Sequence, residues 1–283
     1  MSSAATTHRI DLTIGPVEYA DIGSGPTLVF VHGVFAAGAL WSKVVAALHR
    51  RFRCVVPTFP LGGHRLPANP HAERTPHGLA DAVIELMEKL DLHDVTLVGN
   101  DTGGAICQLV VARRPERVTR LALTNCDAFE AFPPRVLWPL YALASVPGGF
   151  WCFAHLLRLR VMQRAFFASV TRAVPDDASL RMAFAPFIGD VRVRDDVRQV
   201  MRAVSARDTL AAAETFATFE RPVLVAWGTK DLFFPVALGE RLANAFPQGR
   251  LQLVEGARTF VSEDAPMVLA AALDAFVAPP PPV

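Results

Sequence analysis

One short stretch of the chain holds a carboxylate in a setting that suits nucleophilic chemistry. An apolar run starting at Val95 leads into Gly99-Asn100-Asp101-Thr102-Gly103-Gly104, and apolar residues at helical spacing follow. This Gly-x-nucleophile-x-Gly pattern predicts a sharp turn between a strand and a helix, with Asp101 at its tip. Small flanking residues permit such a turn, and the start of a helix favours a negative charge beside it.

The same residues also fit a plain strand-to-helix turn in which Asp101 is only an N-cap, so the surrounding sequence matters. An apolar run, Leu28–Gly33, ends in His-Gly, after which the backbone N–H of Val34 can turn toward Asp101. Together with the N–H of Thr102, it would form a pair of donors for an anion. We interpret His32 itself as a structural loop histidine.

A second carboxylate follows another expected strand. Asp231 comes just after Val223–Gly228, and a carboxylate at this place can orient a catalytic histidine. Taken alone, Asp231 fits a turn residue or an N-cap equally well.

The hydrophobic pattern predicts a parallel sheet that brings these residues together. Buried strands are expected at Leu28–His32, Cys54–Pro57, Val95–Gly99, Leu121–Asn125, Val223–Gly228 and Leu251–Glu255, after a leading antiparallel pair within Ile10–Asp21. Helices are expected at Trp41–Arg50, Gly78–Leu90, Gly104–Arg113 and Val236–Phe246. This alternation is typical of an α/β fold in which helices flank a mostly parallel sheet.

The alternation stops after the sixth strand. Residues 129–206 are predicted to be helical throughout, and we interpret them as a lid, or cap, between two parts of a core, 1–128 and 207–283. An insertion at this point lies over the carboxyl ends of the strands, where sites form. Trp138, Tyr141 and Trp151 are expected to line an apolar pocket there, although packing within the lid is the simpler role for aromatic residues.

One part of the lid, Val136–Leu157, has no charged side chain and is long enough to span a bilayer. Proline and glycine interrupt it at Pro139, Pro147, Gly148 and Gly149. We therefore expect two short, largely buried helices joined by a turn, and no stable insertion into a membrane.

Composition narrows the classes of function. The chain has 283 residues, and 52% of them are hydrophobic, which excludes a disordered chain. A net charge of +1 gives no electrostatic reason to expect a nucleic-acid partner. The four cysteines form no CxxC pair, and the start of the chain lacks a signal-peptide pattern, so a cytoplasmic protein is expected. No metal is expected, since the cysteines form no metal-ligand cluster, and no nucleotide cofactor is expected, since the glycine-rich turn lacks the lysine and spacing of a phosphate-binding loop. The oligomeric state is not predicted.

The segments GSGPTLVFVHG, VGNDTGGA and WGTKDLFFP, with the helical insertion between the last two, resemble the α/β-hydrolase fold in kind and in order. The resemblance covers nearly the whole chain. The Asp at the elbow makes the chain similar to the haloalkane dehalogenase and epoxide hydrolase branch. That resemblance implies attack by Asp101 on carbon to give an ester, hydrolysis of the ester by water, Asp231 as the supporting acid, and an apolar small-molecule substrate.

The chain departs from this family where the catalytic histidine is expected. Thr259 occupies that place, and no histidine follows His155. A carboxylate with a pKa of about 3.9 is already ionised at neutral pH and needs no base for its attack. Hydrolysis of the ester does need a base, and losing one typically costs about 10²–10⁴-fold. A hydrolytic cycle is therefore expected to stall at the ester unless another residue acts.

His64 is the substitute base that we place at the site, in a loop that borders the site in this fold; a surface-loop histidine is the alternative. Glu263 and Asp264 are weaker candidates and suit caps of the last helix. Asp127 and Glu130 follow the sixth strand, where some relatives place their acid.

Other departures concern the leaving group. Dehalogenases of this branch have Trp after the nucleophile and Asn after His-Gly, where this chain has Thr102 and Val34. Epoxide hydrolases have His-Gly-x-Pro and two lid tyrosines, where this chain has Phe35 and Tyr141 alone. We therefore prefer an epoxide to an alkyl halide as substrate. The alternative is a protein that only binds a ligand, or catalyses an elimination or rearrangement, with Asp101 as acid or base.

The residues expected to contact the substrate are Val34, Phe35, Thr102, Trp138, Tyr141, Trp151 and Thr259.

Overall fold

An eight-stranded sheet organises the protein in the computed structural model, which describes residues 7–277. The start of the chain, where no signal peptide is expected, lies partly outside the described residues. The strands are β1 Thr7–Leu12, β2 Gly15–Ile22, β3 Thr27–Val31, β4 Arg53–Thr58, β5 Val95–Asp101, β6 Val118–Cys126, β7 Val223–Gly228 and β8 Gly249–Val254. Their order in the sheet is β1-β2-β4-β3-β5-β6-β7-β8.

The sheet is mostly parallel, as the hydrophobic pattern predicts. β2 pairs antiparallel with β1 and with β4, and every later pairing is parallel. All the expected strands are present. β5 continues to Asp101, two residues beyond the expected end, because Asn100 and Asp101 still pair with Thr124 and Cys126 of β6. The elbow is therefore anchored in the centre of the sheet.

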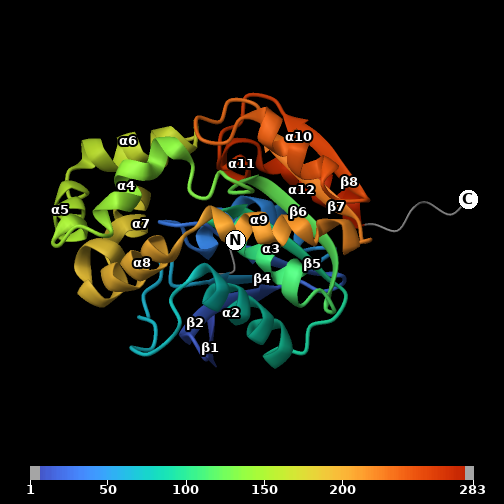
Figure 1. The fold of residues 1–283 in the computed structure, drawn as a ribbon, viewed down its shortest axis with the longest axis horizontal. Helices are drawn as coiled ribbons and strands as arrows, with labels where there is room; N and C mark the ends of the chain where they lie inside the picture. Colours follow the sequence, from blue (N-terminus) through green and yellow to red (C-terminus); the bar gives the residue numbers. More distant parts are fainter. Residues whose placement is uncertain (1–6, 278–283) are drawn as a thin grey trace, which may run out of the picture.

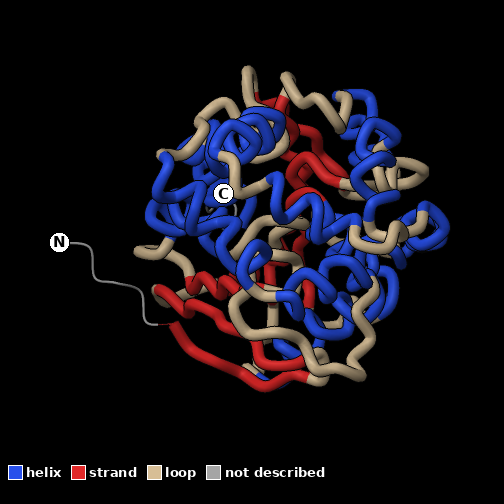
Figure 2. The backbone as a smooth tube through the Cα atoms, turned by 90° about the vertical axis from the view of Figure 1, so that its left-hand side faces the viewer, coloured by secondary structure: helices blue, strands red, loops and turns tan. Residues whose placement is uncertain are grey.

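Helices flank the sheet on both faces (Figures 1 and 2). The core helices are α1 Ser42–Leu48, α2 Pro76–Lys89, α3 Thr102–Arg113, α9 Ala206–Glu214, α10 Val236–Asn244, α11 Val261–Asp264 and α12 Pro266–Val277, with short 3-10 turns η1 Gly38–Trp41 and η3 Phe216–Thr218. α2, α3 and α9 pack side by side, and α1 packs against α12. α2 begins with two features that are typical of helix starts. The hydroxyl of Thr75 accepts the N–H of Gly78 as an N-cap, and Pro76 occupies the first position of the helix.

Between β6 and α9 the chain forms the lid, at the left of Figure 1. Its helices are α4 Trp138–Leu143, α5 Gly149–Leu156, α6 Arg160–Val170, α7 Asp177–Gly189 and α8 Val191–Ala203, preceded by η2 Arg135–Leu137. Buried Leu180, Phe184 and Phe187 of α7 form its interior, and Phe35 of the core packs edge-on against Phe187. Lid and core are therefore joined by aromatic contacts.

The uncharged segment of the lid folds into the two short helices expected, α4 and α5, joined by a turn in which Gly148 has φ +74°. They are less buried than expected. α4 has no buried residue, and α5 buries Gly149, Phe150 and Ala154. Within residues 7–277, no helix has the length and apolar character needed to cross a membrane.

Candidate active site

Asp101 stands at the junction of β5 and α3 with a strained backbone, φ 53° and ψ −133°. The two following glycines make the turn possible. A Cβ on Gly103 would lie 2.4 Å from the carbonyl oxygen of Val31, and one on Gly104 would lie 2.3 Å from the Cβ of Cys126. Any larger residue would push α3 away from β3 and β6, so the Gly-Gly pair is required by close packing.

The loop after β3 passes directly against the Asp101 carboxylate. A Cβ on Gly33 would lie 2.0 Å from Oδ2 of Asp101, so only glycine fits there. The backbone N–H groups of Val34 and Thr102 lie near enough to the carboxylate to lower the pKa of Asp101. The next residue, Phe35, has φ +59° and donates its N–H to the carbonyl of Leu61 at 2.7 Å. Two backbone donors thus face the carboxylate.

Burial, aided by the nearby charge of Asp231 and opposed by the two backbone N–H groups, raises the pKa of Asp101 to about 7. Near neutral pH, a substantial share of Asp101 therefore carries a proton. The ionised form gains population as the pH rises through 7.

Asp231 lies where an orienting acid is expected, but it faces a threonine. Its Oδ1 accepts the N–H groups of Phe233 at 2.7 Å and Phe234 at 3.1 Å, and its Oδ2 is buried without a hydrogen-bond partner. Thr259 is buried beside it, close enough to lower the pKa of Asp231 against the larger raising effect of burial. The hydroxyl of Thr259 also lacks a well-formed hydrogen bond. The acid therefore has no titrating partner at this position.

A second polar group lies beside Asp101, on the side of the lid. The hydroxyl of Thr102 donates to Oδ2 of Asp127 at 3.2 Å, and Tyr141 of α4 lies near Thr102. Burial, and then the charge of Asp101, raises the pKa of Asp127 well above its ordinary value. Asp127 and Tyr141 were separate candidates in the sequence. The role of the Thr102 hydroxyl beside them was not predicted, because Thr102 was considered for its backbone N–H.

His64 must be corrected as the substitute base. Its Nδ1 accepts the N–H of Gly62 at 3.1 Å, and its Nε2 lies 3.1 Å from Oδ2 of Asp196 on α8. Asp196 also accepts the N–H of Ala68 and a guanidinium N–H of Arg74. Both ring nitrogens of His64 are therefore engaged, and the residue ties its loop to the lid instead of facing Asp101.

His32 has the structural role expected of it. Its Nδ1 contacts the carbonyl of Gly33 at 2.9 Å, and its Nε2 accepts the N–H of Phe59 at 3.0 Å. Burial lowers the pKa of His32 to about 4, so the ring is neutral.

The weaker candidate acids are also engaged elsewhere. Glu130 pairs with Arg241 at 2.7 Å on the surface, and Glu263 pairs with Lys43 at 2.7 Å. Asp264 accepts the hydroxyl of Thr171 at 2.6 Å and three backbone N–H groups, so it fastens the lid to the loop before α11.

A small apolar cavity opens onto Asp101. Its volume is about 50 Å³, room for one or two water molecules, whereas ligand pockets usually exceed about 300 Å³. The lining residues are Val34, Phe35, Asp101, Leu137, Leu140, Tyr141, Phe166, Ser169, Val170, Met201, Phe233 and Phe260. Val34, Phe35 and Tyr141, three of the residues predicted to contact the substrate, are among them, and no histidine or tryptophan is among these described residues.

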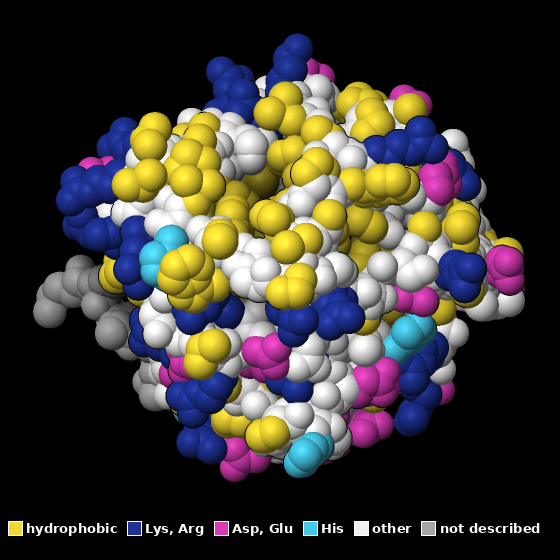
Figure 3. Space-filling view, turned by 60° about the vertical axis from the view of Figure 1, so that its left-hand side comes forward, with side chains coloured by type: hydrophobic (Ala, Val, Ile, Leu, Met, Phe, Trp, Pro, Cys, Tyr) yellow, Lys and Arg dark blue, Asp and Glu magenta, His cyan; other side chains and the backbone are white. Residues whose placement is uncertain are grey.

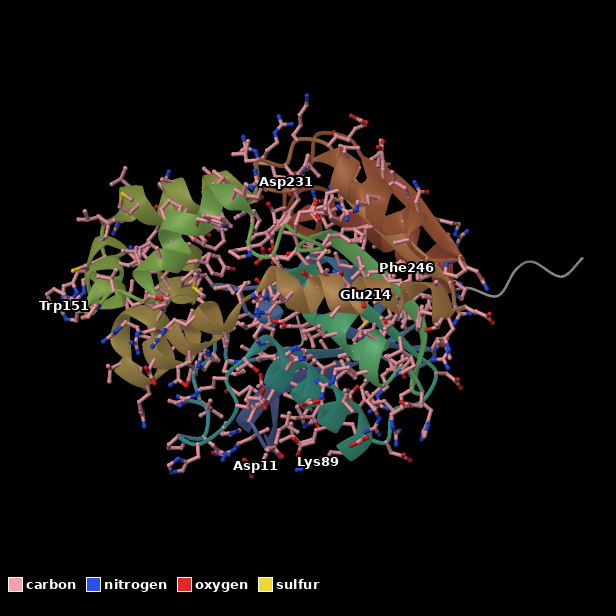
Figure 4. All side chains as sticks on the ribbon, viewed as in Figure 1. Asp11, Lys89, Trp151, Glu214, Asp231 and Phe246 are labelled. Atoms are coloured by element: carbon pink, nitrogen blue, oxygen red, sulfur yellow. The ribbon has the colours of Figure 1, made fainter. Side chains whose placement is uncertain are left out.

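Trp138 and Trp151 do not line this cavity, contrary to expectation. They are 60% and 57% exposed, because their helices turn these side chains to solvent. In Figure 4, Trp151 lies at the outer edge of the lid and Asp231 beside the junction of lid and core. Thr259 is not a lining residue either, since it is buried behind the cavity next to Asp231.

Comparison with known proteins agrees with this architecture. Residues 26–266 match the model of the alpha/beta hydrolase fold family. The chain belongs to the α/β-hydrolase-fold family. Among solved structures, the haloalkane dehalogenase DbeA of Bradyrhizobium elkani has a TM-score of 0.80 at 17% identity, covering 95% of this chain and 96% of that one, and this likeness shows the shared fold.

Two curated relatives define the branch of this α/β-hydrolase-fold protein. Haloalkane dehalogenase 2 of Mycobacterium bovis is 29% identical, covering 93% of this chain and 92% of that protein. A cis-3-alkyl-4-alkyloxetan-2-one decarboxylase of Xanthomonas campestris is 28% identical, covering 96% of each. The resemblance to the dehalogenase-like branch of the family is thereby confirmed.

Proposed function

We propose that this protein is an enzyme in which Asp101 attacks an electrophilic carbon of a small apolar molecule and forms an alkyl ester. One observation carries the proposal. A carboxylate is held in a strained turn, between two backbone N–H groups, at the wall of an apolar cavity. Backbone donors fixed in this way hold the carboxylate in position and cost no reorganisation during the reaction. A cavity of this kind also excludes the water that would solvate the nucleophile.

Tyr141 supports an oxygen leaving group. It lines the same cavity as Asp101, and burial raises its pKa well above the ordinary value, so the hydroxyl keeps its proton. When a strained C–O bond opens, this hydroxyl can protonate the departing oxygen. No indole N–H is available to a halide within the described lining of the cavity. An epoxide, or another strained oxygen ring, is therefore preferred to an alkyl halide.

A second candidate function is breakdown of the Asp101 ester without water. The presence of threonine instead of histidine at position 259 favours it. A threonine cannot deprotonate water near pH 7, and His64 is engaged elsewhere. The Xanthomonas relative is named as a decarboxylase of an oxetan-2-one, a four-membered lactone. The decarboxylation of such a ring needs neither water nor a net proton transfer.

The electrons of that route balance as follows. An oxygen of Asp101 bonds to ring carbon C4, and the C4–O ring bond breaks to leave a free carboxylate. The C3–carboxylate bond then breaks, and its electron pair forms a C3=C4 double bond. The C4–O bond to Asp101 breaks at the same time, releasing carbon dioxide, an alkene and the original carboxylate.

A larger neighbouring cavity supports a substrate with an apolar tail. It has a volume of about 540 Å³ and shares Phe35 and Phe260 with the wall of the small cavity. Leu40, Phe167 and Ala183 add apolar surface to it. A reacting group at Asp101 and an alkyl tail in the larger cavity would use both spaces once the two shared phenylalanine rings move.

Intact-protein mass spectrometry tests the proposal with three reagent classes: alkyl epoxides, alkyl halides and cis-dialkyl oxetan-2-ones. Asp101→Asn, which keeps shape and removes the nucleophile, is the matched control. A persistent adduct with an epoxide on the wild type alone supports ester formation. Release of alkene from the lactone, by the wild type alone, supports the second function. Neither adduct nor product with any class would refute Asp101 as the nucleophile.

A further inference from the structure

The first half of the lid has an unusual charge distribution. Residues 131–175 contain no Asp or Glu but have Arg135, Arg158, Arg160, Arg164 and Arg172. The whole chain has a net charge of only +1, so this positive charge is local. A segment of this length without an acidic residue presents a surface that attracts anions.

Exposed apolar side chains occur in the middle of the same segment, at residues 151–161, which we name the lid tip. Trp151 is 57% exposed, Leu156 42%, Leu159 54% and Val161 68%. Trp151 and Leu156 lie on α5, Leu159 lies in the turn after it, and Val161 lies in the first turn of α6, so the four residues fall within eleven positions of the chain. Isolated exposed apolar residues are ordinary, but a group with an exposed tryptophan marks an interaction surface.

The cations of the lid tip are only partly neutralised. Arg160 and Arg164 share one carboxylate, Asp177, at 2.9 and 2.7 Å. Arg158 is exposed and has no ion-pair partner within residues 7–277. Positive charge therefore borders the apolar residues with little acid to compensate it.

The lid tip points away from the rest of the molecule. Figure 4 places Trp151 at the outer edge of the lid, remote from the sheet. Figure 3 shows hydrophobic side chains on the face that includes the lid, with lysine and arginine side chains around them. Nothing in the described fold covers these residues, so a flat external surface can reach them.

We infer that the lid tip docks reversibly onto an anionic lipid surface, inserting Trp151, Leu156, Leu159 and Val161 among the lipid headgroups. Tryptophan prefers the boundary between headgroup and hydrocarbon, and arginine binds lipid phosphates there. Each basic residue near an anionic membrane contributes about 1 kcal/mol, or about a fivefold gain in binding. A lipid surface needs no shape complementarity, which suits a short, convex group of side chains.

The proposal is independent of the chemistry at Asp101, and its test uses the intact chain. Vesicles of phosphatidylcholine, with and without about one third phosphatidylglycerol, are sedimented with the protein at low and high salt. The test variants are Trp151→Ser combined with Leu159→Ser, and separately Arg158→Gln. The matched controls are Met267→Ser, a 66% exposed apolar residue on α12, and Arg50→Gln, an exposed arginine after α1.

Binding only to the anionic vesicles, weakened by salt, is expected for the wild type and for both controls. The double variant should lose this binding, and Arg158→Gln should weaken it about fivefold. The proposal is wrong if the wild type does not sediment with anionic vesicles, or if the lid-tip variants bind like the controls. A dimer that dissociates in the double variant, without vesicle binding, would assign the surface to a second copy of the chain. Circular dichroism of each variant establishes that the fold is intact.

Discussion

At the scale of single residues, Asp101 has two free-energy costs, backbone strain and a buried carboxyl. A turn with a purely structural role would avoid both. A non-glycine residue with positive φ costs about 1–3 kcal/mol, and such strain clusters at functional sites. Burial of the carboxyl adds a further cost, visible in its raised pKa. Asparagine or glycine would fill the same turn at a lower cost, so the carboxylate itself has a use.

Asp101 should react more slowly in acid. Because burial raises its pKa to about 7, the rate of ester formation should rise about tenfold per pH unit below 7 and level off above. Adduct formation with an epoxide, followed by mass spectrometry from pH 5 to 9, measures this profile, and Asp101→Asn gives the background. A rate that is constant between pH 5 and 7 would show an ordinary carboxylate and contradict the account.

Restoring a base at position 259 should speed the release of the ester. In Thr259→His, the imidazole would stand beside Asp231, whose Oδ2 is free, and water attack should accelerate on the order of 100-fold. The measurement is the lifetime of the epoxide adduct. Thr259→Val is the matched control, which removes the hydroxyl without adding a base.

A second form of this experiment covers the case in which the buried histidine prevents folding. Thr259→Gly opens a space, and free imidazole added to that variant should shorten the adduct lifetime. An unchanged lifetime both in a folded Thr259→His and in the imidazole experiment would contradict the role assigned to this position.

The turn at Asp101 could be predicted because it depends on local spacing. Gly-Asn-Asp-Thr-Gly-Gly after a strand places Asp101 between β5 and α3, with the N–H of Thr102 beside it, whereas the N–H of Val34 comes from the separate loop after β3. The role of His64 could not be predicted. Its partner Asp196 lies 132 residues away on the lid, and no local pattern links the two residues.

At the scale of elements, the contact between α3 and β6 holds the elbow in place. Gly104→Ala would put a methyl group 2.3 Å from the Cβ of Cys126, so we expect about 1–3 kcal/mol of destabilisation. Gly189→Ala on α7 is the matched control, since nothing lies within 4 Å and the change should be neutral or stabilising. Urea denaturation measures both. Equal effects would contradict the close packing.

The hydrogen bond between His64 and Asp196 should hold the lid against the core. Burial alone would raise the pKa of Asp196, but hydrogen bonds from His64, Ala68 and Arg74 outweigh it and lower that pKa. Breaking such a buried pair costs on the order of 3 kcal/mol. Asp196→Asn should therefore increase hydrogen exchange in α8, whereas Asp195→Asn, on the exposed neighbour, should change it little.

The stability contributed by the His64–Asp196 hydrogen bond should depend on pH in one direction. Because the folded pKa of Asp196 lies below the unfolded value, its contribution is present above about pH 4 and is lost as the pH falls further. Protection of α8 that persists in acid, or that is equal in the two variants, would contradict the assignment.

The elements themselves were predictable, but the directions of the lid side chains were not. The proline and glycine interruptions locate α4 and α5, yet Trp138 and Trp151 face solvent instead of the cavity. An apolar helix without polar residues has no periodic mark to show which face is buried.

At the scale of the whole molecule, three buried carboxyl groups make stability depend on pH. Burial is the main cause that raises the pKa of Asp101, Asp127 and Asp231. From about pH 4 upward, the unfolded chain has lost these protons while the folded chain retains them. The free energy of unfolding therefore falls as the pH rises from about 4 through the raised pKa values.

Asp127→Asn should stabilise the protein in alkali. The amide keeps the shape of the side chain and has no proton to hold as the pH rises, so the gain in stability should be larger at pH 8 than at pH 5. Thermal unfolding at both pH values measures it, with the exposed Asp195→Asn as control. A gain that does not grow with pH would contradict the raised pKa.

The fold of the whole molecule followed from the order of its motifs, since strand and helix alternation with one insertion fits few architectures. The size of the cavity could not be predicted in this way, because its volume of about 50 Å³ depends on how Phe35, Phe166 and Phe260 pack from separate elements.

The most direct test of the central claim locates the covalent bond. The protein is pulsed with an alkyl epoxide, quenched in acid and digested, and the peptide Leu90–Arg113 is sequenced by tandem mass spectrometry. The account predicts an added mass of one epoxide on Asp101 that persists because Thr259 supplies no base. An adduct on another residue, or a wild-type protein that turns over epoxide with Asp101 unmodified at every time point, would contradict it.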